Sequence, residues 1–460
     1  MKKAFIFLFL TGFLLRVNAQ IFTQSLNGSI TITPKGLQGK TNPGSDTTNV
    51  ALGPSTLRSM TDGYFNTAIG SGALLRNTGG VGNTALGYST LTSNTIGSGN
   101  TAIGVYPLSH NTTGYDNIAL GYQALYTNTT GYLNTALGSN ALFYNINGYS
   151  NMALGGEALY HNTYGNSNTA IGSGALYNNT EGQANIAIGT GALGSNTYGD
   201  YNIAVGTGAL GYNISAYNNT AVGYNALRNT TGGFNTGIGY RALYGNTSGY
   251  NNTALGMTAL SANTTGNQNT SLGYDAGSLI TIGSNNTFVG YDADASANNL
   301  TNAMALGYNA TVNASNKVRI GNNQITVIEG QVPWSTPSDR RLKENIRYSN
   351  DLGLGFITRL QPASYSYIAD KAHVRHDGFI AQDIEAVMKE MNVPFSGLKK
   401  SEDGTYSLAY SDFVMPLVNA VKEQQKEIEE LKAQLSALEE LKAEITKLKA
   451  DNALRNADRK

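Results

Sequence analysis

One glycine recurs at a fixed spacing through the middle of this 460-residue chain, and this period constrains the fold more than any other feature. Every step is 17 residues except one of 16, between Gly223 and Gly239. An asparagine stands four residues before each of these glycines except the last, where Ala303 replaces it. The recurring glycines are Gly53, Gly70, Gly87, Gly104, Gly121, Gly138, Gly155, Gly172, Gly189, Gly206, Gly223, Gly239, Gly256, Gly273, Gly290 and Gly307. So strict a period predicts a repeat architecture, in which each unit packs only against its neighbours.

The repeated unit favours β-structure. Its "NTALG" segment alternates small or apolar with polar residues over the length of a strand, and the Gly and Asn-Thr clusters supply turns. Seventeen residues are too few for a helix-turn-helix repeat, and the abundance of Gly, Asn and Thr opposes helix. We therefore expect a mainly β fold, with residues 49–330 forming a β-solenoid (β-roll) rod of 17-residue coils.

Stacked coils bring identical residues into register. Asn66 and Asn83 would belong to one ladder, and Leu74 and Leu91 to another. At about 4.8 Å per strand layer, sixteen layers predict a rod about 75 Å long. The expected interior of Ala, Leu, Ile and Val is thin, which suggests that several chains share one core.

Composition excludes several classes of function. The formal net charge is zero, so neither nucleic acid nor an anionic membrane surface is an expected partner. There is no cysteine, which removes disulfides, thiolate metal sites and cysteine nucleophiles. The histidines do not have the spacing of metal ligands, so we expect neither a metal nor a cofactor. They are His110, His161, His373 and His376.

The N-terminus has the features of an export signal. Two lysines precede an apolar run over residues 4–15, and "VNA" at 17–19 supplies a cleavage motif. The run ends at Arg16 and is too short to span a bilayer. We predict a signal peptide over 1–19, cleavage after Ala19, and a secreted or surface-associated protein without a stable membrane span.

Three specific functions of the rod can be compared with a plain scaffold. A polysaccharide-cleaving solenoid needs paired carboxylates, but the acids of the repeats share no register. A calcium site could use Asp275 and Asp292, which occupy the same register in adjacent coils, although a solvated pair also fits. An ice-binding face could use a threonine column, which Ile118, Met152, Ile186 and Ile203 interrupt. The acids are Asp116, Glu157, Glu181 and Asp200, and the threonines are Thr67, Thr84, Thr101, Thr135 and Thr169.

Units such as "NTAIGSGAL" (66–74 and 168–176) resemble the β-roll head repeats of trimeric autotransporter adhesins. The resemblance covers residues 49–330. It implies a homotrimeric, adhesin-like rod, for which a host surface or a glycan is a possible ligand.

Charge changes abruptly after the rod. Residues 49–330 carry 15 charged side chains, whereas the 123 residues from Ser338 onward carry 39. Four motifs follow in order: "SDRRLKENI" (338–346), "LQPASYSY" (360–367), "GFIAQDIE" (378–385) and "YSDFVMPLVNAVKEQQKEIEELK" (410–432). Together they resemble the C-terminal intramolecular chaperones of bacteriophage endosialidase tail spikes and related fibres, which are also autoproteases. The resemblance implies a trimeric domain that guides fibre assembly and then cuts itself off.

Ser338 and Lys343 match the catalytic positions. A serine hydroxyl needs an adjacent base, and lysine can serve if burial lowers its pKa from about 10.4 toward 7. Ser338 would attack the carbonyl of Pro337 in a single-turnover reaction whose nucleophile and electrophile are already joined. Three nearby residues would position the loop, namely Asp339, Arg340 and Asn345. The alternative is a fibre with a glycan-binding or glycan-degrading head and a chaperone domain that no longer cleaves.

Apolar residues at helical spacing predict a coiled coil over 416–456. Ile428, Leu431, Leu435 and Leu438 step by three and four, and a second run resumes after an extra three-residue step, at Leu441, Ile445 and Leu448. The expected organisation is a signal peptide (1–19), an N-terminal segment (20–48), the solenoid (49–330), a linker (331–337), a small α+β chaperone autoprotease domain (338–415) and the coiled coil.

Overall fold

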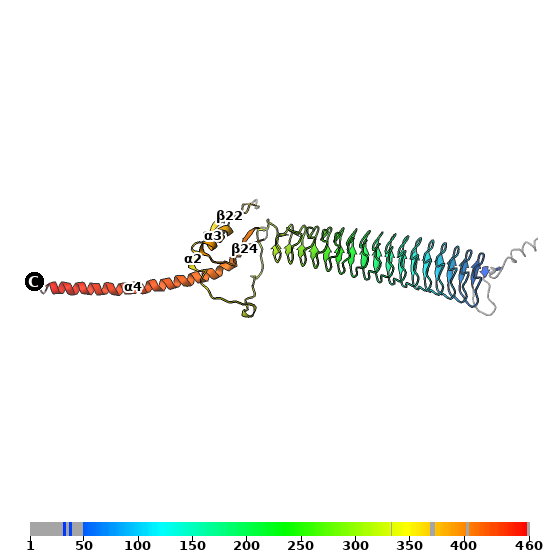
Figure 1. Ribbon diagram of the computed structural model, residues 1–460, viewed down its shortest axis with the longest axis horizontal. Coiled ribbons are helices and arrows are strands. Elements are labelled where there is room, and N and C mark those ends of the chain that lie inside the picture. The colour runs from blue at the N-terminus through cyan, green and yellow to red at the C-terminus, as the bar shows by residue number, and fades with distance from the viewer. Residues whose placement is uncertain are drawn as a thin grey trace, which may run out of the picture. The chain divides into compact units, whose positions relative to one another are not determined.

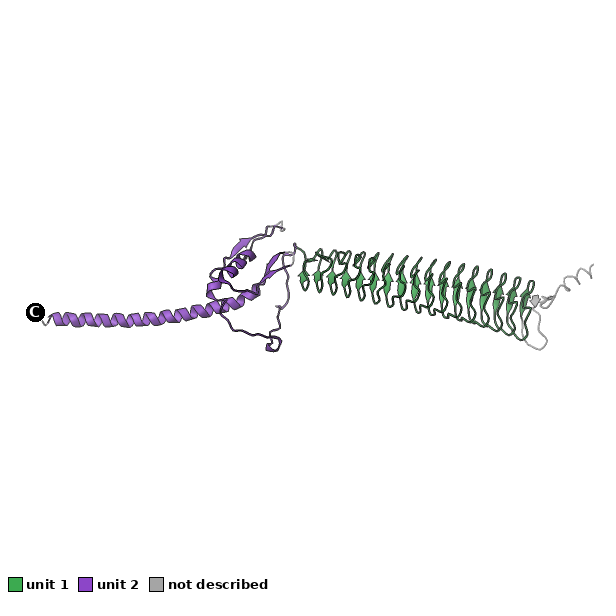
Figure 2. Cartoon of the chain, viewed as in Figure 1, with its two compact units in different colours: residues 1–322 green, residues 323–460 purple. Residues whose placement is uncertain are grey.

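The computed structural model describes residues 31–33, 36–38, 49–332, 334–368, 373–401 and 404–457. The predicted signal peptide and its cleavage after Ala19 lie outside these residues. The chain forms two compact units that divide between Asn322 and Asn323 (Figure 2). Each unit is described separately below.

The first unit is a β-solenoid in which each coil contributes one three-residue strand (Figure 1). Two short strands, β1 (Thr31–Thr33) and β2 (Gly36–Gln38), pair antiparallel before it. The stacked strands are β3 (Val50–Leu52), β4 (Thr67–Ile69), β5 (Thr84–Leu86), β6 (Thr101–Ile103), β7 (Ile118–Leu120), β8 (Thr135–Leu137), β9 (Met152–Leu154), β10 (Thr169–Ile171), β11 (Ile186–Ile188), β12 (Ile203–Val205), β13 (Thr220–Val222), β14 (Thr236–Ile238), β15 (Thr253–Leu255), β16 (Thr270–Leu272), β17 (Thr287–Val289), β19 (Met304–Leu306) and β21 (Val318–Ile320).

Neighbouring strands of the solenoid are parallel and pair at the spacing that the sequence predicts. Ala68 pairs with Ala85, one 17-residue coil later. The 16-residue step pairs Ala221 with Gly237 without breaking the stack. The final step, from β19 to β21, is shorter, and a two-stranded pair of β18 (Asp294–Ala295) and β20 (Thr311–Val312) lies beside this end. The predicted β-solenoid of 17-residue coils is confirmed.

The interior of the solenoid holds alanine, leucine and asparagine. In the coil around Gly138, for example, Ala136, Ala141 and Leu142 are completely buried. Ile280 and Val312 are buried at the C-terminal end, as expected, but the Ile and Val residues at the third position of the stacked strands lie outside the core. The single chain buries these residues by itself; the expected sharing of a core between chains stays a prediction. Buried asparagine occupies the space that larger apolar residues would otherwise fill.

Asparagine ladders connect the coils through the interior. The Asn151 backbone N–H donates to Oδ1 of Asn134 (3.0 Å), and its Nδ2 donates to the Gly165 carbonyl (2.8 Å). A second ladder includes Asn145, whose Nδ2 donates to Asn128 Oδ1 (2.7 Å). These bonds satisfy polar groups that would be costly to bury alone. The ladders therefore fix the register between the coils that they join.

The recurring glycine is required by a close backbone approach. Gly138 has a φ of 138°, and a Cβ added there would lie 2.5 Å from the carbonyl oxygen of Gly155 in the next coil. A side chain at this position would clash with backbone, and the φ angle is one that residues with side chains rarely adopt. The strict recurrence of this glycine thus follows from stacking.

The second unit begins with irregular chain and a 3₁₀ turn, η1 (Arg340–Leu342). A small α+β region follows, built from α2 (Leu354–Ile357), β22 (Ala363–Tyr365), β23 (His376–Gly378), α3 (Ala381–Met391), β24 (Leu398–Lys400), β25 (Tyr406–Leu408) and η2 (Tyr410–Phe413). The strands form two antiparallel hairpins. Phe356, Ile384, Phe395 and Phe413 form the buried centre of this region.

A long helix, α4 (Val414–Ala457), ends the unit. Its first turns contact the start of α2 and the residues just before it. Glu423 accepts a hydrogen bond from the Leu354 backbone N–H (2.6 Å), and Asn419 donates to the carbonyl of Ser349. Farther along α4, the predicted coiled-coil residues stay 44–62% exposed; they are Ile428, Leu431, Leu435, Leu438, Leu441, Ile445 and Leu448. No helix in the described part of the chain is both long and apolar enough to cross a membrane.

Candidate functional site in the loop of residues 337–346

The η1 turn folds the start of the second unit back on itself. Asp339 caps the turn, because its side chain accepts a hydrogen bond from the Arg341 backbone N–H (2.8 Å). The turn closes where the Lys343 N–H donates to the Arg340 carbonyl (3.1 Å). These two bonds place position 343 close to position 338, although five residues separate them.

The turn brings the two predicted catalytic side chains into contact. Nζ of Lys343 donates a hydrogen bond to Oγ of Ser338 at 2.7 Å. This distance is within the range over which a proton can pass between a nucleophile and its base. Both residues are exposed in the single chain, as is Pro337 before them. The arrangement can deliver a serine hydroxyl to a peptide bond of the same loop.

The three predicted supporting residues have different places in the loop. Asp339 forms the cap described above, and Arg340 contributes its carbonyl oxygen to closing the turn. Asn345 has a φ of 53°, a left-handed conformation that asparagine tolerates better than most residues and that turns the chain after the dyad. Asp339 acts through its side chain, and Arg340 and Asn345 through their backbone. The hydrogen bond to the Ser338 hydroxyl comes from Lys343.

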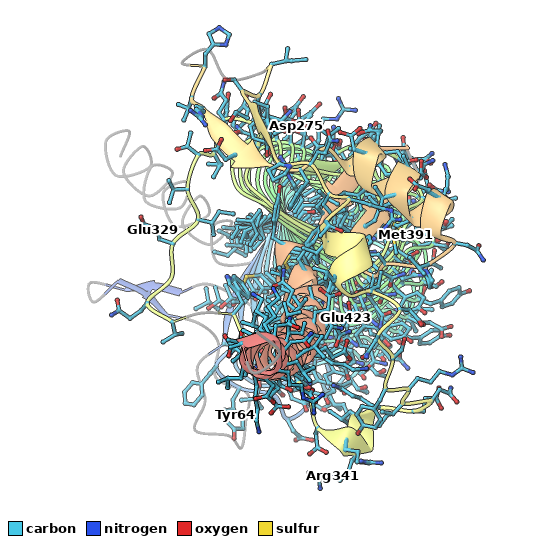
Figure 3. The ribbon with its side chains drawn as sticks, turned by 90° about the vertical axis from the view of Figure 1, so that its left-hand side faces the viewer. Tyr64, Asp275, Glu329, Arg341, Met391 and Glu423 are labelled. Carbon is cyan, nitrogen blue, oxygen red and sulfur yellow. The ribbon has the colours of Figure 1, made fainter. Side chains whose placement is uncertain are left out.

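Arg341 is a further residue of the loop that sequence reasoning missed. Its guanidinium donates hydrogen bonds to both oxygens of the Asp339 carboxylate, and the shortest of them is 2.6 Å. Hydrogen bonds from the Arg341 side chain, and then from its backbone, lower the pKa of Asp339. Figure 3 labels Arg341, which projects into solvent and is 87% exposed. The partners are two positions apart in the sequence, and a charge pair at that spacing was the available signal.

The other predicted motifs supply the framework of the α+β region. Within "LQPASYSY", Ser364 donates to Asp377, which is also paired with Arg375. The Tyr410 hydroxyl accepts from the Phe379 backbone N–H (3.0 Å), which connects "GFIAQDIE" to the residues just before α4. These contacts connect the motifs to one another within the α+β region.

The solenoid places the residues considered for calcium binding, polysaccharide cleavage and ice binding as follows. Asp275 and Asp292 do lie in equivalent turns of adjacent coils, with φ of 55° and 52°. Among the residues that the structure describes, however, no group of three His, Asp or Glu side chains could hold a metal ion. Glu157 has the same position in its own coil, far from these two, whereas Asp116, Glu181 and Asp200 occupy three different positions. The threonines at the first strand position are interrupted as the sequence shows.

Asp294 is an unusual acid at the C-terminal end of the solenoid. Burial raises its pKa to about 6, against the opposing effect of hydrogen bonds from Ala295, Leu279 and Ser278, and the nearby Asp292 carboxylate adds to the rise. The folded state therefore holds this proton more tightly than the unfolded chain does. The resulting stability is fully present below pH 3.8 and is lost as pH rises through about 6.

We expect Asp294→Asn to remove this pH dependence. As pH rises from 4 to 7, the free energy of unfolding of the wild type should fall by about 2–3 kcal/mol relative to that of the variant. Hydrogen exchange at the Leu279 and Ala295 amides, corrected for intrinsic exchange rates, measures this change in stability with pH. Asp116→Asn, at an exposed acid, should keep the wild-type profile. A pH-independent difference for Asp294→Asn would contradict the assignment.

Comparison with known protein families identifies the second unit. Residues 338–392 match the Peptidase S74 family model, described as "Chaperone of endosialidase". The match begins at Ser338 and includes η1, α2, both strands of the first hairpin and α3. The chain therefore carries an endosialidase-chaperone domain following a β-solenoid. No curated protein gave a significant match to the chain.

Proposed function

We propose that this chain is one subunit of a secreted or surface-associated trimeric fibre, exported through the signal peptide predicted at residues 1–19. Its C-terminal unit acts as an intramolecular trimerisation chaperone and then cuts the chain between Pro337 and Ser338. The observation that carries the proposal is the 2.7 Å hydrogen bond between Lys343 Nζ and Ser338 Oγ, at the first residue of the matched family domain.

The proposed reaction needs only groups of this loop and one water molecule. Lys343, in its neutral form, takes the hydroxyl proton as Ser338 Oγ attacks the carbonyl carbon of Pro337. The C–N bond breaks, the proton passes to the amine of Ser338, and an ester joins Pro337 to Oγ. Water then hydrolyses the ester, which leaves a carboxylate on Pro337 and restores the hydroxyl of Ser338.

Exposure of the dyad indicates when the cut occurs. A lysine acts as a base only when its amine is neutral, and removal from water favours that form. In one chain the Ser338–Lys343 pair is open to solvent. We propose that neighbouring subunits cover the loop during assembly, so that release of the chaperone follows the formation of the fibre.

Two apolar surfaces support association between copies. One is the exposed row of leucine and isoleucine along α4, which is too long and too regular to remain in water. The other consists of the third residue of each stacked strand, and we call it the outer aliphatic row. This residue is Ile, Leu or Val in all seventeen stacked strands, from β3 to β17 and in β19 and β21. A surface that repeats at every coil over about 80 Å is best matched by the same surface of another copy.

Substitutions in α4, followed by light scattering, test whether the protein is a trimer. In an uncut Ser338→Ala background, light scattering should give the mass of three 48.6 kDa chains, less any signal peptide. The pair Leu435→Lys and Leu438→Lys places charge in the apolar row and should shift the population to monomer. The matched pair Gln434→Lys and Ser436→Lys lies on other faces of the same turn and should leave the trimer intact. A monomeric or dimeric parent protein would overturn the trimer.

A further inference from the structure

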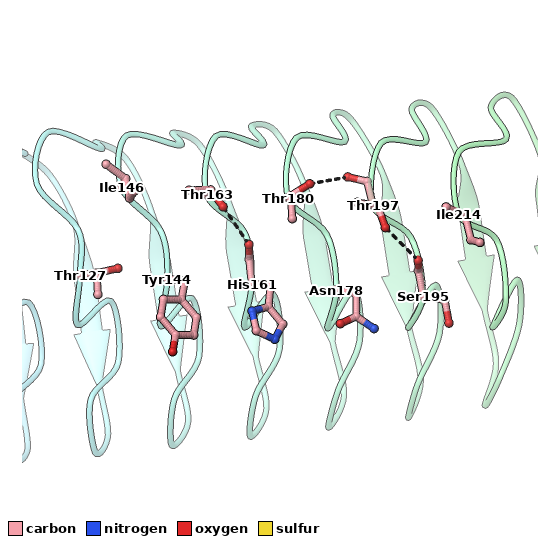
Figure 4. Close-up of a pocket in the computed structure, with 10 residues that line it drawn as sticks. All are labelled: Thr127, Tyr144, Ile146, His161, Thr163, Asn178, Thr180, Ser195, Thr197 and Ile214. Carbon is pink, nitrogen blue, oxygen red and sulfur yellow. Dashed lines mark hydrogen bonds between the residues drawn. The ribbon is translucent and has the colours of Figure 1, made fainter.

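The solenoid is not uniform along its length: a groove lies on its surface over the coils between residues 127 and 214 (Figure 4). Its volume is about 720 Å³. Figure 4 shows its side chains in two rows that run from coil to coil. One row is Thr127, Tyr144, His161, Asn178 and Ser195, and the other is Ile146, Thr163, Thr180, Thr197 and Ile214.

The groove forms where each coil turns inward. The two rows stand immediately before and immediately after a buried asparagine, such as Asn145 or Asn179, whose side chain points into the interior ladder. No strand residue lines the groove. It is therefore separate from the outer aliphatic row, and association through that row does not use the groove residues.

Aromatic side chains concentrate at this place. Tyr126, Phe143, Tyr160 and Tyr177 occupy one position in four consecutive coils and stack with centroids 5.1, 5.3 and 5.2 Å apart. The coils on either side have Ser109 and Gly194 at this position, so the solenoid does not need an aromatic residue there. Such a local departure from the repeat indicates a function beyond stacking.

Two rings stand inside the groove itself. Tyr144 and His161 stack with centroids 5.3 Å apart and planes 3° from parallel. Tyr144 is 42% exposed, which leaves much of its ring available to a ligand. Beyond His161 the same row continues with the smaller Asn178 and Ser195. The groove therefore has an aromatic part at Tyr144 and His161 and a polar part at Asn178 and Ser195.

The lining is uncharged but rich in hydrogen-bonding groups. The ten residues include no Asp, Glu, Lys or Arg. Thr163 and Thr180 donate their hydroxyl protons to the carbonyls of His161 and Thr197, which leaves their oxygens able to accept. The Asn178 amide nitrogen donates to the Gly194 carbonyl, and its oxygen can accept as well. Hydroxyl and amide groups beside aromatic rings suit a ligand with many hydroxyls and apolar C–H faces.

The backbone around the groove disfavours a peptide ligand. A peptide that adds to a sheet needs unpaired backbone groups. Here the N–H groups of Tyr144, His161 and Asn178 already donate to carbonyls of the next coil, at 3.0–3.1 Å. Recognition must come from side chains, and similar side-chain positions recur at about 4.8 Å along the rod. A linear polymer of similar units fits that repetition.

We propose that this groove binds a neutral, linear polysaccharide along the solenoid axis. Sugar C–H faces pack against Tyr144, while sugar hydroxyls bond to the threonine, asparagine and serine groups of both rows. The inference rests on the proposed function in requiring an exported rod, but it does not depend on the cutting reaction of the C-terminal unit.

Affinity electrophoresis of the protein, purified as it assembles from the full chain, tests the groove. Gels would contain a soluble β-glucan, a galactomannan, a xylan or a polymer of N-acetylated amino sugar, with polygalacturonate as the anionic comparison. We expect at least one neutral polymer to retard the protein and polygalacturonate to have no effect. Tyr144→Ala combined with His161→Ala should weaken retardation about ten-fold or more. Ser195→Trp, which fills the groove without removing a ring, should do the same.

Tyr240→Ala is the matched control. Tyr240 is 44% exposed and stacks on Tyr224 outside the groove. This variant should bind as wild type does. Retardation by the anionic polymer alone, by none of the polymers, or equally in the Tyr144/His161 and Tyr240 variants would overturn the proposal. Trimer mass and cleavage, measured on the same samples, show separately whether the fibre has assembled and cut itself.

Discussion

Ser338→Ala is expected to leave the chain whole while the trimer still assembles. The substitution removes the hydroxyl that lies 2.7 Å from Lys343 Nζ but leaves the Asp339 cap and the buried phenylalanines of the domain unchanged. Loss of a serine nucleophile lowers the rate of acyl transfer by about 10⁴-fold or more. The fraction of cut chain on a denaturing gel, followed over days, measures the effect.

Two variants of Lys343 distinguish its role as a base from the effect of its positive charge. Lys343→Ala removes the amine, and Lys343→Arg keeps a positive charge that cannot become neutral. Both should stop the cut. Arg341→Ala should only slow it, because Asp339 still accepts from the backbone N–H of residue 341. Cutting that continues at the wild-type rate in Lys343→Arg would exclude lysine as the base.

Asn151→Leu is expected to destabilise the solenoid strongly. The replacement removes the donor to the Gly165 carbonyl and the acceptor for the backbone and side-chain N–H groups of Asn168. Each buried polar group left without a partner costs about 1–3 kcal/mol, so the free energy of unfolding should fall by about 3–6 kcal/mol. Because coils contact only their neighbours, the damage should be centred on the coils near residue 151.

Denaturant unfolding and hydrogen exchange by coil measure this change. Asn147→Ala is the control, since Asn147 lies four residues away and is exposed. Its effect should stay within about 0.5 kcal/mol. If Asn151→Leu and Asn147→Ala unfolded at the same denaturant concentration, the ladder would not be the source of register and stability.

The period predicted the solenoid because stacking imposes the same requirement on every coil. Gly138 must approach Gly155 closely, and Asn134 must meet Asn151, so both residue types recur. The sequence did not show which apolar residues face inward. Alternation in "TAL" is compatible with either face, and the outcome depends on the narrow space left by the Ala-Leu pair and the two asparagine ladders. β21 lies within the predicted range 49–330, but its step from β19, which is shorter than 17 residues, was not predicted.

In the second unit, the four ordered motifs predicted the domain, and the match of Ser338 and Lys343 to the catalytic positions of the resembled family predicted the pair. The contact itself depends on η1, a three-residue turn whose cap and closing bond are not evident from composition. Arg340 and Arg341 are adjacent and chemically equal in sequence. Only the turn distinguishes them, because it directs Arg341 back to Asp339. Burial of the dyad was expected from its chemistry, and a single chain does not provide it.

Intact-mass spectrometry of the purified wild-type protein tests the central claim most directly. We predict two products, a rod fragment that ends at Pro337 and a chaperone fragment that begins at Ser338, together with one uncut species in Ser338→Ala. A wild-type trimer of a single, uncut mass would leave the domain as a chaperone that no longer cleaves. The same two fragments from Ser338→Ala would contradict self-cleavage and implicate an external protease.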